Sequence, residues 1–313
     1  MKGKLNLLQD LWLSNCIFGE GFDAFEVAHS LATLTSRNGT GSQTPLPWKQ
    51  IRSLQIRFST LPIALQELSS APESIEVELH CCNLRTQRNA THITHDLRSL
   101  SIVVDTEDPD VHHWFDWLTL PRLTSLTIAG DKIKRPSYRS VDDSFPSFLS
   151  RSSCTITSLS LVDLPISDVD AIVLLSLLPL LSSLTIHEHE ARPFKNSIIT
   201  ARLLDALVVD RNNIFSDRRP SSLHTKRLQS LDLRLHATLP AKAISQVVES
   251  RWTSDAEYSA VVGVDDLRTV KVLVLRSTNR TVLDVDELLN SLDWIKRAGL
   301  QLICASRRSD RDR

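Results

Sequence analysis

The stretch Leu123-Thr124-Ser125-Leu126-Thr127-Ile128 decides the fold of this chain, because copies of it return along most of the sequence. The shared form is Leu-x-Ser-Leu-x-Leu/Ile, in which Ile sometimes replaces the first Leu. Clear copies begin at Ile51, Leu97, Ile156, Leu181 and Leu228, and weaker copies are Leu8-Leu11-Leu13, Ser74-Ile75-Val77 and Leu204-Leu207-Val209. Recurrence at a fixed interval indicates a protein built from stacked structural repeats.

Each copy predicts a strand with one buried side, because apolar and polar residues alternate in its second half. The copies begin at residues 51, 72, 97, 123, 156, 181, 204 and 228. Most of these intervals lie in or near the range of about 20 to 29 residues that is typical of leucine-rich repeats. Segments of helical period separate the strands: one is capped by Ser167 and ended by Pro179, and two more span 241–252 and 285–297.

Together these elements predict an α/β leucine-rich-repeat solenoid. Parallel strands need crossover connections, and such connections are right-handed. We therefore expect a right-handed horseshoe with a parallel concave sheet and irregular helices on the convex side. The solenoid is expected to span residues 1–306, with loop insertions near 35–48, 131–150 and 211–226, a last strand near 267–275, and a disordered basic tail at 307–313. A further copy should lie between residues 8 and 51, but no stretch there matches the phrase clearly.

Bulk composition excludes several classes of protein. A formal net charge of −1 gives no general attraction to nucleic acid or to an anionic membrane, so neither partner is expected. No apolar run is long enough to span a bilayer, and residues 1–18 lack the features of a secretory signal. We expect a cytoplasmic or nuclear protein. The five cysteines are scattered and odd in number, which favours free thiols, and the apolar run before Cys304 should raise the pKa of that thiol.

The repeat phrase, the Leu-Pro pairs Leu120-Pro121 and Leu178-Pro179, and the stretch Val264-Asp265-Asp266-Leu267-Arg268-Thr269-Val270 resemble fungal F-box proteins of the leucine-rich type. The resemblance covers about residues 5 to 305 and is more specific for the solenoid than for its ligand. It implies a repeat region that holds the substrate of an SCF ubiquitin ligase, with an F-box that binds the ligase adaptor. No F-box pattern follows Leu61-Pro62 or precedes the first copy, so we expect a truncated gene model or a fragment.

The sequence offers little for catalysis, and we predict no enzyme activity and no cofactor. Gly-x-Ser-x-Gly, a phosphate-binding loop and His-Glu-x-x-His are all missing. The densest set of metal ligands is His187-Glu188-His189-Glu190, where two imidazoles could begin a zinc site. No third ligand can be named, so a solvated polar turn is the preferred interpretation. Trp114 and Trp117 are expected on a helix, where they fill the core or, alternatively, form an interface.

What remains is the surface on which the strands turn their polar side chains outward. This concave face is the candidate protein-binding site, with charged residues toward its ends and small hydroxyls in its middle. Such a face could hold a protein segment in extended contact, or its Ser and Thr could be there only because they suit exposed strand positions. The predicted site residues are Gln55, Arg57, Glu76, Glu78, Ser101, Thr127, Ser160, Thr185, His187, Asp210, Asp232 and Arg234.

Three hypotheses for function follow. In the first, the chain is the substrate-recognition region of an F-box receptor, with a ubiquitination substrate as its partner and the SCF adaptor as a second partner only if an F-box lies upstream. In the second, it is a free-standing leucine-rich-repeat interaction protein with no link to ubiquitin. In the third, it is a metal enzyme that uses His187 and His189. The first is preferred and the third is the least favoured.

Overall fold

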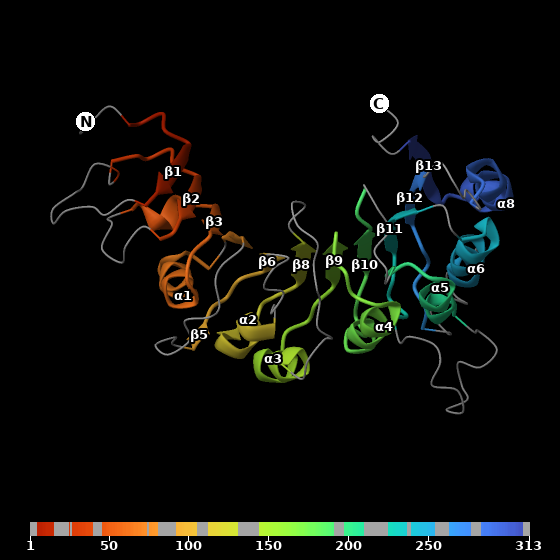
Figure 1. The fold of residues 1–313 in the computed structure, drawn as a ribbon, viewed down its shortest axis with the longest axis horizontal. Helices are drawn as coiled ribbons and strands as arrows, with labels where there is room; N and C mark the ends of the chain where they lie inside the picture. The colour runs from red at the N-terminus through yellow and green to blue at the C-terminus, as the bar shows by residue number, and fades with distance from the viewer. Residues whose placement is uncertain are drawn as a thin grey trace. The chain divides into compact units, whose positions relative to one another are not determined.

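The chain folds into two compact units, Met1–Thr155 and Ile156–Arg313, which are called unit 1 and unit 2 below and are described separately (Figure 1). The computed structural model describes residues 5–15, 25, 27–39, 46–73, 75–80, 92–104, 112–130, 144–190, 197–209, 225–236, 239–253, 263–276 and 283–308.

Unit 1 is a parallel sheet with helices in its crossovers. Its sheet strands, in spatial order, are β1 (Asp10–Ser14), β2 (Thr33–Arg37), β3 (Ser53–Arg57), β4 (Glu76–His80), β6 (Ser99–Val104) and β8 (Ser125–Gly130). Its helices are η1 (Trp48–Gln50), α1 (Leu61–Ser70), α2 (His112–Trp117) and α3 (Ser144–Ser152). The short strands β5 (Ile93–Thr94) and β7 (Leu118–Thr119) form a separate parallel pair.

Strands and helices alternate through the described part of unit 2. Its elements are β9 (Ser158–Val162), α4 (Asp168–Ser176), β10 (Ser183–His187), α5 (Ala201–Leu207), β11 (Ser230–His236), α6 (Ala241–Arg251), β12 (Thr269–Arg276), α8 (Val285–Arg297) and β13 (Gln301–Arg308). Each of its strands pairs in parallel with the next one along the chain. A helix lies in every crossover, which is what parallel pairing requires.

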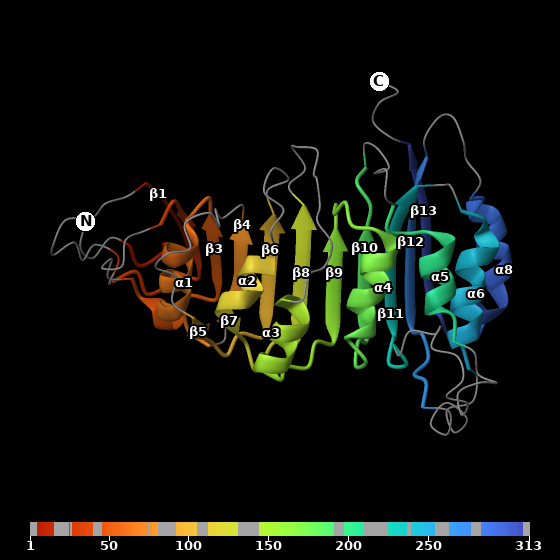
Figure 2. The ribbon, with the colours of Figure 1, turned by 60° about the horizontal axis from the view of Figure 1, so that its bottom comes forward.

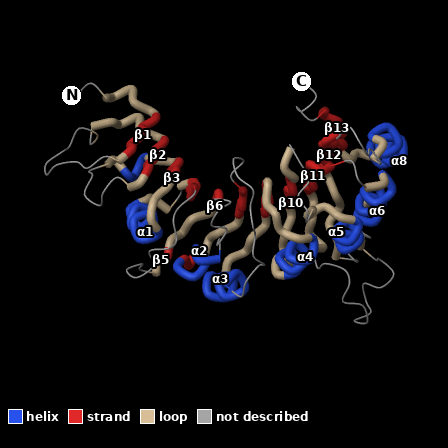
Figure 3. The backbone as a smooth tube through the Cα atoms, viewed as in Figure 1, coloured by secondary structure: helices blue, strands red, loops and turns tan. Residues whose placement is uncertain are grey.

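Alternation along the strands separates core from surface in both units. In β3, for example, Leu54 and Ile56 are fully buried while Ser53, Gln55 and Arg57 are half-exposed. Parallel register stacks equivalent residues into rows, so each buried position continues from strand to strand. The helices of unit 1 lie on one side of its strands, and so do those of unit 2 (Figures 2 and 3). The apolar rows and these helices form the core of each unit.

Most of the predicted strands and helices are confirmed. Strands lie at all six clear copies of the repeat phrase, and β1 and β4 lie at two of the weak ones. Ser167 caps α4 as expected: its hydroxyl accepts a hydrogen bond from the Asp170 amide at 3.1 Å, and the Asp170 carboxylate accepts one from the Ser167 amide. This reciprocal arrangement satisfies two amides that the helix leaves free. The helices at 241–252 and 285–297 are α6 and α8.

The loop predicted near 35–48 is wrong at its start, because β2 occupies Thr33–Arg37. This strand lies in the interval between residues 8 and 51 where a further copy was expected, and it pairs in register with β1 and β3. The phrase was hidden because a polar residue, Ser36, stands where the other copies have Leu or Ile. Ser36 is fully buried and donates a hydrogen bond to the buried carboxylate of Glu67 on α1 at 2.9 Å. A partner in the core thus makes the hydroxyl acceptable at an inward position.

The strand predicted at Leu204-Leu207-Val209 is also wrong, because residues 201–207 form α5. Thr200 caps this helix by accepting a hydrogen bond from the Leu203 amide at 3.2 Å. Leu203, Leu204 and Leu207 are all buried, and that spacing is helical. A short apolar run fits the period of a strand as well as that of a helix. Here the Thr200 cap favours the helix.

The C-terminal boundary needs a further correction, because a strand beyond 267–275 was not predicted. β13 follows α8 and extends through Arg308, so the first two residues of the expected tail belong to a strand. α3 likewise begins at Ser144, inside the loop expected at 131–150, whereas residues 131–143 and 211–224 lie outside the described part of the chain. Among the described residues, none of the helices has the length and apolar character needed to cross a membrane.

Candidate protein-binding face

The side of each sheet that faces away from the helices is lined by three rows of outward side chains, and we call this side the strand face. In unit 1 the first row holds Asp10, Thr33, Ser53, Glu76, Ser99 and Ser125; the middle row holds Trp12, Thr35, Gln55, Glu78, Ser101 and Thr127; the third row holds Ser14, Arg37, Arg57, His80, Val103 and Ala129. The third row lies at the carboxyl ends of the strands.

The strand face of unit 2 is built in the same way. Its first row holds Ser158, Ser183, Ser230, Thr269 and Gln301; its middle row holds Ser160, Thr185, Asp232, Lys271 and Ile303; its third row holds Val162, His187, Arg234, Leu273 and Ala305. Most of these residues are half-exposed, and Ile303 is 57% exposed.

The structure assigns eleven of the twelve predicted site residues to these rows. Gln55, Glu78, Ser101 and Thr127 are register neighbours on unit 1, and Ser160, Thr185 and Asp232 are register neighbours on unit 2. Arg57, His187 and Arg234 belong to third rows, and Glu76 belongs to a first row. Asp210 lies outside the described residues.

Several strand-face residues were not predicted, and most of them are on strands that the repeat phrase marks poorly. Thr35 and Arg37 were missed with β2, and Ile303 was missed with β13. Trp12 stands between Leu11 and Leu13 in a recognised weak copy, so the alternation rule could have found it. It is 64% exposed, which is unusual for so large an apolar side chain.

Polar side chains on the strand face of unit 2 pair across the strands. His187 on β10 hydrogen-bonds through Nε2 to the Asp232 carboxylate on β11 at 3.0 Å. Arg234 donates to the Glu190 carboxylate at 2.6 Å, and Arg307 on β13 lies 3.5 Å from the same carboxylate. These contacts join side chains that are 45, 44 and 117 residues apart in the chain. Arg234 and Arg307 therefore share one carboxylate, that of Glu190.

The cluster His187-Glu188-His189-Glu190 is divided between surface and core. Glu188 is only 5% exposed, and its carboxylate accepts hydrogen bonds from the amides of His236 and Ile199 and from the Ser197 hydroxyl. It ties the segment before α5 to the end of β11. The backbone carbonyl of His189 contacts His236 Nε2 at 3.0 Å. Within the described part of the chain, no three His, Cys, Asp or Glu side chains are grouped closely enough to hold a metal ion.

The other tryptophan, histidine and cysteine side chains considered as functional candidates lie in or against the core. Trp114 is 2% exposed in the core of unit 1, which confirms its core-filling role, whereas Trp117 is half-exposed. His95 is buried and contacts the Ala71 carbonyl at the end of α1. Cys304 belongs to the inward row of β13, and burial raises the pKa of its thiol to about 11, as the apolar surroundings predicted. Burial also raises the pKa of the Cys154 thiol, so neither thiol is an activated nucleophile.

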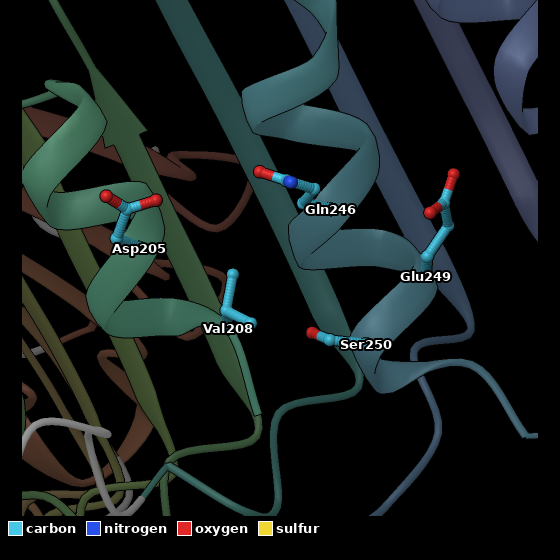
Figure 4. Close-up of a pocket in the computed structure, with 5 residues that line it drawn as sticks. All are labelled: Asp205, Val208, Gln246, Glu249 and Ser250. Atoms are coloured by element: carbon cyan, nitrogen blue, oxygen red, sulfur yellow. The ribbon is translucent and has the colours of Figure 1, made fainter. Parts of the chain in front are cut away.

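A groove of about 600 Å³ lies on the helix side of unit 2, between α5 and α6 (Figure 4). Its lining residues are Asp205, Val208, Gln246, Glu249 and Ser250. The Ser250 hydroxyl is committed to the backbone, since it accepts from the Val209 amide and donates to the Val247 carbonyl. Among the described lining residues, neither Asp205 nor Glu249 has a basic side chain beside it.

Comparison of the chain with protein-family models, with curated proteins and with solved structures finds no match.

Proposed function

We propose that this chain is a non-catalytic leucine-rich-repeat scaffold that binds a protein segment on its strand faces. One observation carries the proposal: in each unit the helices lie on one side of the sheet, while the other side presents rows of half-exposed polar side chains in strict register. Such rows offer closely spaced hydrogen-bonding groups along a rigid sheet, which suits an extended partner.

We also propose that the fold is a right-handed leucine-rich-repeat solenoid. Strands that pair in parallel with their sequence neighbours, alternate burial within each strand, and intervals near those of leucine-rich repeats all favour a right-handed solenoid. Each repeat would then bury its apolar side only by stacking against its neighbours.

A role as the substrate-recognition region of an SCF ubiquitin ligase rests on the sequence resemblance alone. Such a role would place the chain in the cytoplasm or nucleus and would require an F-box. Co-purification of the ligase adaptor with the protein expressed from its native locus tests this role. A protein that binds its partner without the adaptor would instead be a free-standing interaction protein.

Substitution of small strand-face residues by a large side chain tests whether the strand face binds a protein segment. We expect Thr127→Arg in unit 1 or Ser160→Arg in unit 2 to weaken a selected peptide ligand at least about tenfold, because a long charged side chain would cover the row beside it. The ligands would be chosen from a library of random dodecapeptides by selection on the whole chain. Gln66→Arg on α1 and Val173→Arg on α4 are matched controls on exposed helix positions. Equal binding by the strand-face and helix variants would contradict the proposal.

Asp232→Ala separates binding from folding on unit 2. We expect the free energy of unfolding to fall by less than about 1 kcal/mol, because the His187–Asp232 contact is partly exposed to solvent. Ligands that lie on the middle row of unit 2 should nevertheless lose affinity. Chemical denaturation measures the first effect and fluorescence anisotropy of a labelled peptide the second. A large loss of stability would show that Asp232 is a structural residue.

A further inference from the structure

The strongest unexplained feature of unit 1 is a strained aromatic residue, Phe58, at the edge of its strand face. The residue that follows each of the first three strands has a left-handed backbone: Asn15 has a φ of 51°, Asn38 of 60° and Phe58 of 51°. Each donates its amide hydrogen to the carbonyl of the last residue of the next strand, so the three turns are equivalent. Asn tolerates this conformation, whereas a bulky aromatic residue rarely adopts it. Strain of this kind persists mainly where it serves a function.

The ring of Phe58 is placed among third-row side chains of the neighbouring strands. The guanidinium carbon of Arg37 on β2 lies 5.0 Å from the ring centroid, and the His80 ring on β4 lies 5.5 Å from it at a tilt of 60°. Despite these contacts, Phe58 remains 43% exposed. A guanidinium held over an aromatic face is fixed in orientation while its outer N–H groups stay available to an acceptor.

The third row of unit 1 is also the basic row of this face. Arg37 and Arg57 are register neighbours, and among the described residues the carboxylate beside them is that of Glu78, which lies 3.8 Å from the Arg57 guanidinium. Both members of that ion pair are about one third exposed, so the pair is weak. The acidic residues of the first row, Asp10 and Glu76, stand at the opposite ends of the strands. Positive charge is therefore concentrated where the strands end.

A second aromatic surface lies beside this row. Trp12 projects from β1, the strand next to β2, and is the most exposed aromatic side chain among the described residues. Tryptophan and arginine are the side chains that most often dominate protein interfaces. We call Trp12, Arg37, Arg57 and Phe58 the aromatic-basic edge.

We propose that the aromatic-basic edge is the recognition site for an extended segment of a partner protein that carries acidic side chains next to an aromatic or aliphatic one. Carboxylates would pair with the Arg37 and Arg57 guanidiniums, and the apolar side chain would pack on Trp12 and Phe58. Charge complementarity selects the acidic partner, because the edge holds two guanidiniums and, among the described residues, Glu78 is the carboxylate that lies beside them. This inference rests on the proposed function and names the class of ligand and its place on unit 1.

Phe58→Asn tests the site, because it places at position 58 the residue found at the equivalent positions 15 and 38. Random dodecapeptides selected on the whole chain should be enriched in Asp and Glu beside an apolar residue, and their affinity should fall as salt rises. We expect Phe58→Asn and Arg37→Glu each to weaken such peptides about tenfold or more. The relief of strain should at the same time leave the melting temperature of Phe58→Asn unchanged or raise it by about 2 to 4 °C.

Matched controls come from unit 2. Trp12→Ala should weaken the selected peptides as Arg37→Glu does, and its control is Trp294→Ala, which removes a tryptophan that is 57% exposed on α8. The control for Arg37→Glu is Arg202→Glu, which reverses an exposed charge on α5. Neither control should change peptide affinity by more than about twofold.

The inference is overturned if the selected peptides lack acidic enrichment, if they bind Phe58→Asn as tightly as the wild type, or if Phe58→Asn melts several degrees lower and so shows a structural role for the ring. Peptides whose affinity is unchanged by substitutions in the aromatic-basic edge but is lowered by Thr127→Arg or Ser160→Arg would still support the proposed function. Peptides that respond to no strand-face substitution, or a selection that yields no binder, would count against both.

Discussion

Leu231→Asp should unfold unit 2 under conditions in which the wild-type chain is fully folded. Leu231 is completely buried, and it lies in the inward row with Leu159, Leu184, Val270 and Leu302. An unpaired carboxylate at this position costs several kcal/mol, whether it stays charged or takes up a proton. That cost is comparable to the whole stability of many domains, about 5 to 15 kcal/mol. Because β11 pairs with β10 on one side and with β12 on the other, the loss should spread to both of these strands.

Hydrogen exchange measured by mass spectrometry would show this loss strand by strand. The matched control is Ser160→Asp, which introduces the same charge at an outward, half-exposed position of β9. It should cost less than about 1 kcal/mol. Leu126→Asp is the corresponding change in unit 1, where Leu126 is also fully buried. Wild-type protection and an unchanged cooperative melt in either Leu→Asp variant would refute the assignment of the inward rows.

Arg251→Ala should be the second most damaging change, with a loss of about 3 to 5 kcal/mol. Arg251 lies in the last turn of α6 and is fully buried. Its Nε donates to the Leu207 carbonyl at 2.7 Å, its Nη1 to the Thr225 carbonyl at 2.8 Å, and its Nη2 to the Thr225 hydroxyl at 3.1 Å. The guanidinium thereby provides a hydrogen-bond donor for the last carbonyl of α5 and joins this helix to the segment before β11. Alanine would leave these acceptors unpaired and a cavity in place of the side chain.

Urea denaturation followed by circular dichroism measures this effect. The free energy of unfolding of Arg251→Lys should lie between those of the wild type and Arg251→Ala, because one ammonium cannot reproduce the planar set of donors of the guanidinium. Arg202→Ala, at an exposed position of α5, should change stability by no more than about 0.5 kcal/mol. Wild-type resistance of Arg251→Ala to urea would show that the buried guanidinium is dispensable.

The same residue predicts a pH dependence. Burial lowers the pKa of the Arg251 guanidinium from its usual value in an unfolded chain to about 10. Because the unfolded chain then binds the proton more tightly than the folded chain, the contribution of Arg251 to stability rises with pH between these two values and is constant below them. The stability difference between the wild type and Arg251→Ala should therefore stay constant from about pH 6 to pH 9 and widen above about pH 10.

Sequence patterns predicted the strands where the repeat phrase was intact and the helices where a cap or a proline marked their ends. They failed where a side chain was satisfied by a partner far along the chain, and where a short apolar run fitted a strand and a helix equally well. Ser36 breaks the apolar pattern of β2, but its hydrogen bond to Glu67, 31 residues away, makes it a core residue. The sequence 204–209 fits a strand as well as a helix, and the Thr200 cap and its packing decided for α5.

Alternation along each strand was enough to determine which side chains turn inward, because successive residues of a strand point to opposite sides whatever the neighbouring strand is. Which outward residues become neighbours depends on the sheet register. The loops that join the strands vary in length, so distance along the chain does not reveal that register. Only the tertiary structure therefore brings Phe58 between Arg37 and His80, and His187 against Asp232.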